Sequence, residues 1–384
     1  MEHRIIYILK HNPWGRGGGA VASRLYLKAM SNIFCNSSID VLLADTCLAD
    51  IPADVPHNLN FISVNERSFI SKVLSPLSGI MHRYQDLAKV LVTKYKYEWC
   101  VFDHSSIGGT LIKYMVKNGV KVIQLHHNHE PKYYKDSSTS LIDKLIFLPI
   151  VKKNERYSYK NSTINLFLTD ADKNIFERKY GSYGNINTTT GVYIENYNRD
   201  VSFTTNYEKK IKIAITGALN SAQNVDAIKE FILKYYDALT SKVDAKIIIA
   251  GNKPPIEIKQ ICSRKSNISL IDSPLDIDEA IKDCNIFLCP CRLGSGIKIR
   301  VLDGFRNGML IIAHNVSASG YEEAMKKGYL LPYTTPEEFV NGVQLFEKKV
   351  TESVNIKAQV ISFAKETYSL NNIVKKIEYA ISKV

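Results

Sequence analysis

The sequence of 384 residues lacks several features that would assign it to a class at once. No apolar run approaches the roughly 20 residues that a membrane-spanning helix needs, and the N-terminus lacks a signal-like apolar core. The seven cysteines are scattered without the spacing of metal ligands. Zinc-finger, homeodomain and aromatic RNA-binding patterns are also missing, so no nucleic acid partner is expected. We therefore expect a cytoplasmic protein, because a reducing compartment suits scattered cysteines.

The length and composition predict a two-domain globular protein. Apolar residues make up 45% of the chain and charged residues 23%, as in ordinary soluble proteins, and 384 residues exceed the size of one hydrophobic core. Strand patterns alternate with helix patterns throughout, which predicts an α/β fold with parallel sheets. A polar, aperiodic stretch between Glu195 and Glu208 is the expected linker. The domains are then 1–200 and 208–370, with a last helix at 371–384 that packs back on the first domain.

The net charge of +12 is the unusual bulk property, and most of the excess lies in the first half of the chain. An anionic membrane surface is one candidate partner, since each basic residue near such a surface contributes about 1 kcal/mol. The alternative is a solvated basic surface. The lysines considered for membrane contact are Lys72, Lys89, Lys94, Lys96, Lys152 and Lys153.

The segment 289–308 is the part of the sequence that says most about function. A strand pattern ends at Cys289, a loop with two glycines follows, and a helical pattern continues to Gly308 before the next strand. Such a turn leaves backbone N–H groups unpaired at the start of the helix, where anions bind. Lys298 and Arg300 would add cations for a diphosphate, and Asp303 a carboxylate for ribose hydroxyls. The alternative is a solvated face in which Asp303 is an ion-pair partner.

This stretch resembles the donor-binding segment of retaining glycosyltransferases of family 4, whose usual pattern is Gly-x-Gly-x-Arg-x-Lys-Val-Leu-Glu-Ala. Lys298 takes the place of the Arg, Arg300 of the Lys, and Asp303 of the Glu. An acidic residue of many members is replaced here by Ser295. The resemblance implies a GT-B fold, two facing Rossmann-like domains with a cleft between them. It also implies that the donor diphosphate lies at a helix start at Gly296, near Ser295 and Ile297, without a metal.

The segment 126–130 contains three histidines within four residues. Consecutive residues of an extended chain point to opposite faces, so these histidines are not expected to bind one metal ion. His127, Asn128 and Glu130 resemble the His-Asn-x-Glu signature of bacterial members of the same family. The resemblance implies that His127 lies beside the transferred sugar, with His126 as the alternative. The preceding strand ends at Asp103 and His104, which are expected on the acceptor side of the crevice. The alternative is a helix cap by Asp103 or Ser106.

Near the N-terminus, a glycine-rich loop follows the first strand. The resemblance places such a loop in the cleft, with Gly17 and Gly18 near the substrate and Arg16 as a phosphate contact. Gly15, Gly17 and Ala20 also match a dinucleotide fingerprint, with Asp45 as ribose acceptor. Five residues separate that first glycine from the strand, which favours the first interpretation.

Two further loops of the second half resemble the same family. The run from Gly217 to Ala227 is similar to the start of its second domain, and Asn224 is a good N-cap for the following helix. This loop lacks the Arg and Lys of many relatives, so Lys298 and Arg300 must supply the charge. Ser319 and Gly320 occupy the positions of the family's Glu-Gly.

These observations predict a retaining glycosyltransferase that moves a sugar from a nucleotide-diphosphate donor to a saccharide or lipid-linked saccharide, in bacterial surface polysaccharide synthesis. His127, Lys298, Arg300 and Asp303 are its expected catalytic residues, and no cofactor is required. The leaving phosphate itself would deprotonate the acceptor. The enzyme would be cytoplasmic or peripheral on the inner face of the cell membrane. The alternatives are a catalytically silent binding partner of another transferase and an NAD-dependent enzyme.

Overall fold

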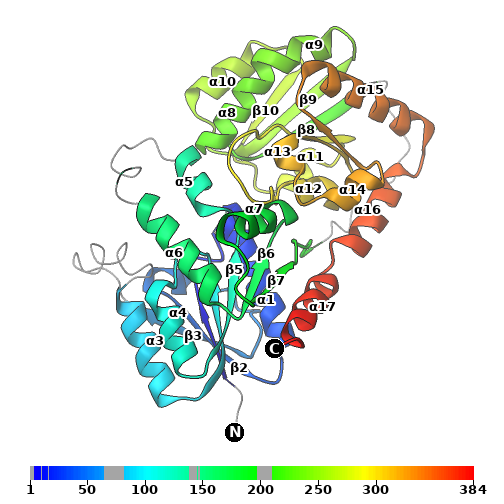
Figure 1. Cartoon of the computed structure of the whole chain (residues 1–384). Helices are drawn as coiled ribbons and strands as arrows, with labels where there is room; N and C mark the ends of the chain where they lie inside the picture. The colour runs from blue at the N-terminus through cyan, green and yellow to red at the C-terminus, as the bar shows by residue number, and fades with distance from the viewer. Residues whose placement is uncertain are drawn as a thin grey trace. The chain divides into compact units, whose positions relative to one another are not determined.

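The structure is a computed structural model of the whole chain. It describes residues 4–9, 11–15, 17–64, 82–137, 145, 148–196 and 210–384. The chain divides into two compact units (Figure 1). Unit 1 comprises Met1–Val192 and Leu370–Val384, and unit 2 comprises Tyr193–Ser369. The predicted linker lies mainly at 197–209, outside the described residues.

Unit 1 is built on a seven-stranded, fully parallel sheet with the order β3-β2-β1-β4-β5-β6-β7. The strand order reverses between β1 and β4, which makes this the place where ligands bind in such sheets. The strands are β1 Arg4–Ile8, β2 Ser38–Ala44, β3 Leu59–Val64, β4 Tyr97–Asp103, β5 Lys121–His126, β6 Ile164–Phe167 and β7 Ile186–Thr189.

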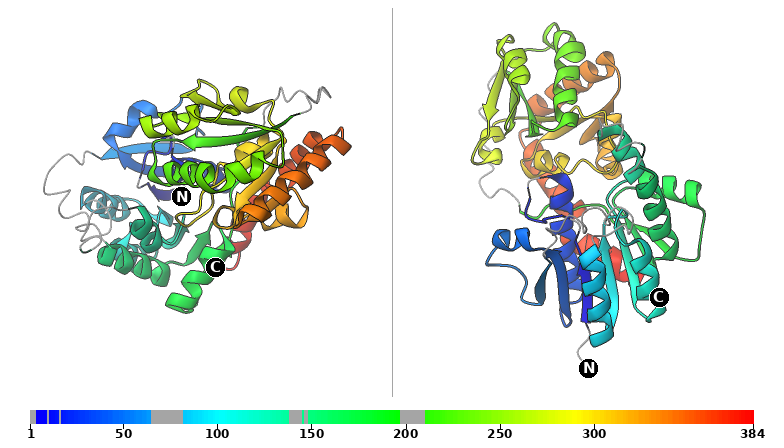
Figure 2. Two further views of the ribbon diagram at one scale, coloured as in Figure 1. Left: turned by 90° about the horizontal axis from the view of Figure 1, so that it is seen from above. Right: turned by 90° about the vertical axis from the view of Figure 1, so that its left-hand side faces the viewer.

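Helices lie on both sides of the sheet in each unit (Figures 1 and 2). In unit 1, α3 and α4 cover one face and bury an apolar cluster that includes Ile6, Cys100, Phe102 and Met115. The helices of unit 1 are α1 Gly18–Ile33, α3 His82–Lys94, α4 Gly109–Lys117, α5 Glu130–Ser137, α6 Leu148–Asn161, α7 Asp170–Tyr180 and α17 Leu370–Ile381, and η1 spans Asp45–Asp50.

The last helix, α17, belongs to unit 1 although the preceding helices belong to unit 2. Its apolar stripe of Ile373, Ile377 and Ala380 is buried, as expected for residues three and four positions apart on one helix face. This stripe packs against α1, β6 and β7 (Figure 1). Lys376 adds a hydrogen bond from its Nζ to the carbonyl oxygen of Thr190 at 3.3 Å.

Unit 2 contains a six-stranded parallel sheet with the order β10-β9-β8-β11-β12-β13. The strands are β8 Ile211–Ala218, β9 Ala245–Asn252, β10 Ile268–Asp272, β11 Ile286–Cys289, β12 Leu310–His314 and β13 Leu330–Tyr333. The helices are α8 Ala222–Glu230, α9 Tyr236–Thr240, α10 Ile256–Ser263, α11 Ile277–Ile281, α12 Val301–Arg306, α13 Asn315–Ala318, α14 Glu322–Lys326, α15 Pro336–Glu352 and α16 Ile356–Thr367, with a π-turn η3 Phe231–Tyr235 between α8 and α9.

The α/β class and the parallel sheets are confirmed, whereas several element boundaries differ from the sequence predictions. The helix predicted over 140–159 is described only from Leu148, because most of 138–147 lies outside the described residues. Strands β7 and β13 were not predicted. Among the described residues, no helix combines the length and apolar character required to cross a membrane.

Close packing of two backbones in unit 2 gives a testable consequence. A Cβ atom at Gly251 in β9 would overlap the carbonyl oxygen of Gly217 and lie 2.9 Å from Cγ of Leu219. We expect Gly251→Ala to lower the free energy of unfolding by about 1–3 kcal/mol, because an overpacked core must shift. Urea denaturation of the purified variant measures this change.

The matched control is Gly342→Ala, within α15 of the same unit. A Cβ there lies no closer than 3.7 Å to Leu331 and Ile312, so alanine is expected to stabilise the helix by about 0.5–1 kcal/mol. Equal unfolding free energies for the two variants would contradict the packing argument.

Candidate functional site

In unit 2 the strand order reverses between β8 and β11, and the predicted donor-binding segments lie there. The chain leaves β8 at Ala218 and enters α8, while it leaves β11 at Cys289 and reaches α12 through the loop 290–300. The carboxyl ends of parallel strands on either side of such a reversal open a crevice for ligands. The fold therefore brings two segments about 80 residues apart to one edge of the sheet.

Arg300 joins these two segments. Its Nη1 donates to the carbonyl oxygen of Thr216 at 3.3 Å and to Oδ1 of Asn224, and Nδ2 of Asn224 donates to the carbonyl oxygen of Ala218 at 2.8 Å. Gly217 has a φ of +150°, and a Cβ there would lie 2.7 Å from Nη1 of Arg300. The predicted residues Gly217, Asn224 and Arg300 are thus in direct contact.

Lys298 is buried, with 8% of its surface exposed, so it is not part of a solvated face. Its Nζ donates to the carbonyl oxygen of Ser295 at 3.2 Å. Two buried hydroxyls hold the same loop in place: Tyr321 donates to the carbonyl oxygen of Lys298 at 3.0 Å, and Ser317 to that of Cys291 at 2.6 Å. The sequence analysis missed both hydroxyl residues, because nothing in their spacing indicated which loop they would reach.

The predicted helix start at Gly296 is wrong. Gly294 and Gly296 have φ values of +89° and +73°, in the left-handed region that glycine tolerates and a right-handed helix excludes. The segment 294–297, including Ser295 and Ile297, is therefore a loop, and α12 begins only at Val301. The backbone N–H groups at this corner therefore belong to a loop and not to the start of a helix.

The prediction of Asn224 as a helix N-cap is also wrong. Ser221 occupies the N-cap position of α8, and Asn224 lies within the first turn, where it is buried. Its side chain instead serves the contact with Arg300. A second polar side chain of this turn, Gln223, lies against Gly294, where a Cβ would be 2.7 Å from its Nε2. The sequence analysis did not identify Gln223. Its position next to Asn224 was the one feature of the sequence that could have indicated a role in this contact.

Asp303 pairs with Arg306, whose Nη2 lies 3.1 Å from Oδ1 of the carboxylate. This pair matches the ion-pair alternative considered for the sequence. Its side chain nevertheless remains 29% exposed. Burial raises the pKa of Asp303 to about 6, although Arg306 opposes this shift. The carboxylate is thus ionised at neutral pH and accessible to a hydroxyl donor.

The last predicted loop of unit 2 follows the short helix α13. Ser319 lies at its end, and Gly320 has a φ of +91°. The N–H of Gly320 donates to Oε1 of Glu322 at 2.9 Å. Since Tyr321 contacts the backbone of Lys298, this loop lies beside the loop 290–300.

In unit 1, Asp103 is the centre of a buried polar cluster at the ends of β1, β4 and β5. Its Oδ1 lies 2.5 Å from Nε2 of His127, and Tyr7 donates its hydroxyl to Oδ2 at 3.0 Å. Burial alone would raise the pKa of Asp103, but His127 and His104 together hold it below its usual value. The carboxylate therefore fixes the orientation of the His127 ring. Tyr7 was not predicted, because a tyrosine within an apolar strand reads as core.

His104 completes this cluster. Its ring stacks on that of His127, with 3.8 Å between centroids and 12° between planes, and its Nδ1 lies 3.2 Å from Oε1 of Glu130. Its φ of +89° is unusual for a residue with a side chain. The atoms of Asp103, His104 and His127 that could coordinate a metal ion lie within 4.8 Å of one another. A metal ion must lie in the plane of each imidazole that binds it, however, and nearly parallel stacked rings do not allow this for both histidines. We therefore interpret the cluster as a hydrogen-bonded network.

The neighbouring histidine, His126, has a different environment. Its ring stacks on Phe167 at 4.7 Å and its Nε2 lies 2.9 Å from Oδ1 of Asn165. Burial lowers the pKa of His126 to about 3. His126 therefore belongs to an aromatic core, which favours His127 among the two alternatives. Asn128 follows, and its Oδ1 is buried without a hydrogen-bond partner in the described part of the chain.

The glycine-rich loop of unit 1 leads into α1 beside the same cluster. Gly17 is the N-cap residue and Gly18 the first residue of α1. A Cβ at either position would meet no atom within 4 Å, whereas one at Gly19 would lie 3.8 Å from the His104 ring. The structure thus places the loop next to His104. Arg16 lies outside the described residues.

A second buried carboxyl, Glu155 of α6, continues the network from Glu130. Its Oε2 accepts the backbone N–H of Glu130 at 2.8 Å, and its Oε1 accepts the hydroxyl of Tyr180 at 2.7 Å. Burial, reinforced by the nearby charge of Glu130, raises the pKa of Glu155 to about 8. Glu155 was not predicted, because a single acidic residue among basic ones in a helical pattern indicates a surface position.

Comparisons with known proteins place this geometry in context. Residues 210–346, all within unit 2, match the family described as glycosyl transferases group 1. Over its whole length the chain is similar to sucrose-phosphate synthase from Thermosynechococcus elongatus, with a TM-score of 0.71, 12% identity and coverage of 100% of this chain and 99% of that one. The chain has a GT-B glycosyltransferase fold.

Other solved structures share the GT-B fold. WaaG, a glycosyltransferase involved in lipopolysaccharide biosynthesis, matches with a TM-score of 0.66 and 13% identity over 97% of this chain and 98% of that one. HepE from Anabaena, in complex with UDP, matches with a TM-score of 0.68 and 11% identity over 99% of this chain and 100% of that one.

A curated relative is an uncharacterized 44.6 kDa protein in the cps region of Klebsiella pneumoniae, 28% identical over 174 residues. The match covers 43% of this chain and spans less than half, 44%, of that relative's length.

The raised pKa of Glu155 predicts a measurable pH dependence of stability. The folded chain keeps this proton up to about pH 8, whereas the ordinary value is 4.5. Between these values the unfolded chain releases the proton first, so stability is lost as the pH rises. Glu155→Gln cannot titrate, so its unfolding free energy relative to the wild type should increase from about pH 5 to about pH 8.5 in urea denaturation. A difference that stays constant with pH would refute the assignment.

Proposed function

We propose that the protein is a retaining glycosyltransferase that moves a sugar from a nucleotide-diphosphate donor to a saccharide or lipid-linked saccharide acceptor. The observation that carries this proposal is the corner between β8 and β11, where Lys298, Arg300 and a glycine-rich loop meet within the segment that matches group 1 glycosyltransferases. Such a corner offers backbone N–H groups and two cations to a diphosphate.

In this mechanism the donor diphosphate binds to the loop 294–297, Lys298 and Arg300. Negative charge grows on the leaving phosphate as the glycosidic bond breaks, and fixed cations stabilise it. Metal-independent chemistry and departure of the acceptor proton to the leaving phosphate are part of the proposal. Asp303 would accept hydrogen bonds from the ribose hydroxyls. Because Gly217 has no side chain, the Arg300 guanidinium has room at this position.

His127 is proposed to position the transferred sugar. Its Nδ1 has no hydrogen-bond partner among the residues that the structure describes, while its Nε2 is held by Asp103. A ring fixed on one side and unpaired on the other suits a contact with a substrate hydroxyl. Gly17, Gly18, Asn128 and Glu130 would form the surroundings of this group.

The proposed biological role is bacterial surface polysaccharide synthesis at the inner face of the cell membrane. The cps-region relative and the similarity to WaaG support this role. Because HepE binds UDP, a uridine diphosphate sugar is the first donor to test.

A catalytically silent binding protein with this fold is the second candidate. Asp303 pairs with Arg306, and Arg300 with Asn224. Both residues predicted to bind the sugar donor therefore already have partners within the protein, which favours this second candidate. Sugar transfer, or hydrolysis of a nucleotide sugar, by the purified protein would exclude it.

The proposal predicts which cations bind the donor. Lys298→Ala and Arg300→Ala should each weaken UDP binding by about 1.5–3 kcal/mol in calorimetric titration, the value of a hydrogen bond to a charged group. NAD should not raise the melting temperature, whereas UDP should.

Lys348→Ala is the matched control, since Lys348 is 70% exposed on α15 of the same unit. Its UDP affinity should equal that of the wild type. Unchanged affinity in both Lys298→Ala and Arg300→Ala would count against the donor site.

A further inference from the structure

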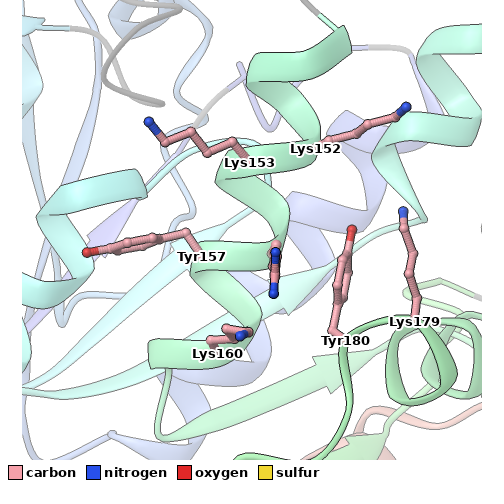
Figure 3. Close-up of a pocket in the computed structure, with 7 residues that line it drawn as sticks. Lys152, Lys153, Tyr157, Lys160, Lys179 and Tyr180 are labelled. Carbon is pink, nitrogen blue, oxygen red and sulfur yellow. The ribbon is translucent and has the colours of Figure 1, made fainter.

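Unit 1 carries a second cationic site, remote in sequence from the predicted donor segments. A pocket of about 450 Å³ lies at α6 and α7 (Figure 3). Five of its seven lining side chains are basic and none is acidic. The lining residues are Lys152, Lys153, Arg156, Tyr157, Lys160, Lys179 and Tyr180.

The arrangement of these cations on α6 is unfavourable in the absence of a ligand. Lys152, Arg156 and Lys160 are four residues apart and share one face of the helix, where like charges destabilise it. Lys152 and Arg156 are exposed to solvent, and within the described part of the chain no carboxylate forms an ion pair with any of the three. Lys160 instead lies over the ring of Tyr183, with 4.2 Å from Nζ to the centroid.

Lys179 of α7 lines the same pocket. Its Nζ lies 2.7 Å from Nε2 of His129. Burial, followed by the nearby charges of Lys179 and Lys132, lowers the pKa of His129 to about 4, so His129 is a neutral acceptor. Figure 3 shows Lys152 extending to the side of α6 on which Lys179 and Tyr180 lie. Lys179 thus adds positive charge to that of α6.

The nearest buried acid does not neutralise the pocket. Glu155 is bonded to the hydroxyl of Tyr180, and burial raises its pKa, which favours the neutral form of this carboxyl beside Lys179. Cations gathered in one pocket repel one another, and an anion of several charges would relieve this repulsion.

We propose that the pocket at α6 and α7 binds the diphosphate group of a phosphorylated ligand. Several cations exceed the charge of a single phosphate, which indicates two linked phosphates rather than one, and lysine and arginine are the side chains that bind phosphate oxygens. This site is separate from the donor diphosphate proposed for unit 2, and its ligand is either a soluble diphosphate or one carried by a lipid.

Inorganic pyrophosphate is the probe, titrated calorimetrically at about 0.15 M salt, where surface attraction is screened. The protein is Lys298→Ala/Arg300→Ala, so that the predicted donor site of unit 2 does not contribute. We expect binding at one site in this background. Adding Lys152→Gln, Arg156→Gln and Lys160→Gln should weaken it at least about tenfold, the effect of one lost charged hydrogen bond.

The matched control adds Lys89→Gln, Lys94→Gln and Lys117→Gln, which remove the same charge from α3 and α4. Its affinity for pyrophosphate should stay within about twofold of the background, well below the tenfold that one charged contact is worth. No pyrophosphate binding, or equal losses in the two triple variants, would overturn the proposal. Both outcomes leave UDP binding by the wild type as a separate test of the donor site.

Sedimentation with vesicles distinguishes the two sources of the ligand. Binding to phosphatidylglycerol vesicles that pyrophosphate displaces, and that the α6 triple variant loses, would assign the site to a lipid-borne phosphate. Pyrophosphate binding without vesicle binding would assign it to a soluble diphosphate. Phosphatidylcholine vesicles are the neutral control.

Discussion

The candidate site of unit 2 depends on the contact between the Arg300 guanidinium and the end of β8. The missing side chain of Gly217 leaves room for this contact, and Asn224 holds the guanidinium from the next helix. It fixes the loop 290–300 against the loop after β8, so that cations and backbone N–H groups lie at one corner. Without the Arg300 contact, the crevice between β8 and β11 would have no cation held at a fixed position.

Unit 1 follows a different principle, in which charge is buried and paired. Asp103 orients His127 on one side and receives Tyr7 on the other, and Glu130 links His104 to Glu155. Buried carboxyls of this kind are costly unless hydrogen bonds satisfy them. The same burial that holds a histidine in place raises the pKa of Glu155 and so favours its neutral form beside the lysines of α6 and α7.

The sequence predicted those features that depend on local pattern. Strands such as β11 have continuous apolar residues, as expected in a parallel sheet buried on both faces, whereas β7, with the sequence Ile-Asn-Thr-Thr, and β13, which contains Pro332, do not show this pattern and were missed. The predicted helix start at Gly296 was wrong because Gly294 and Gly296 take positive φ values that a pattern of residue types does not reveal. The partners of Arg300 come from β8 and α8, and that of His127 from the end of β4. These contacts depend on how strands and helices far apart in sequence pack together, which residue types alone do not reveal.

The central claim is that a diphosphate binds at the corner between β8 and β11. A crystal structure of the protein with UDP tests it most directly. The account predicts diphosphate oxygens within hydrogen-bonding distance of Nζ of Lys298 and of backbone N–H groups at 294–297. A uridine diphosphate bound elsewhere, with this corner filled by the protein's own side chains, would contradict it.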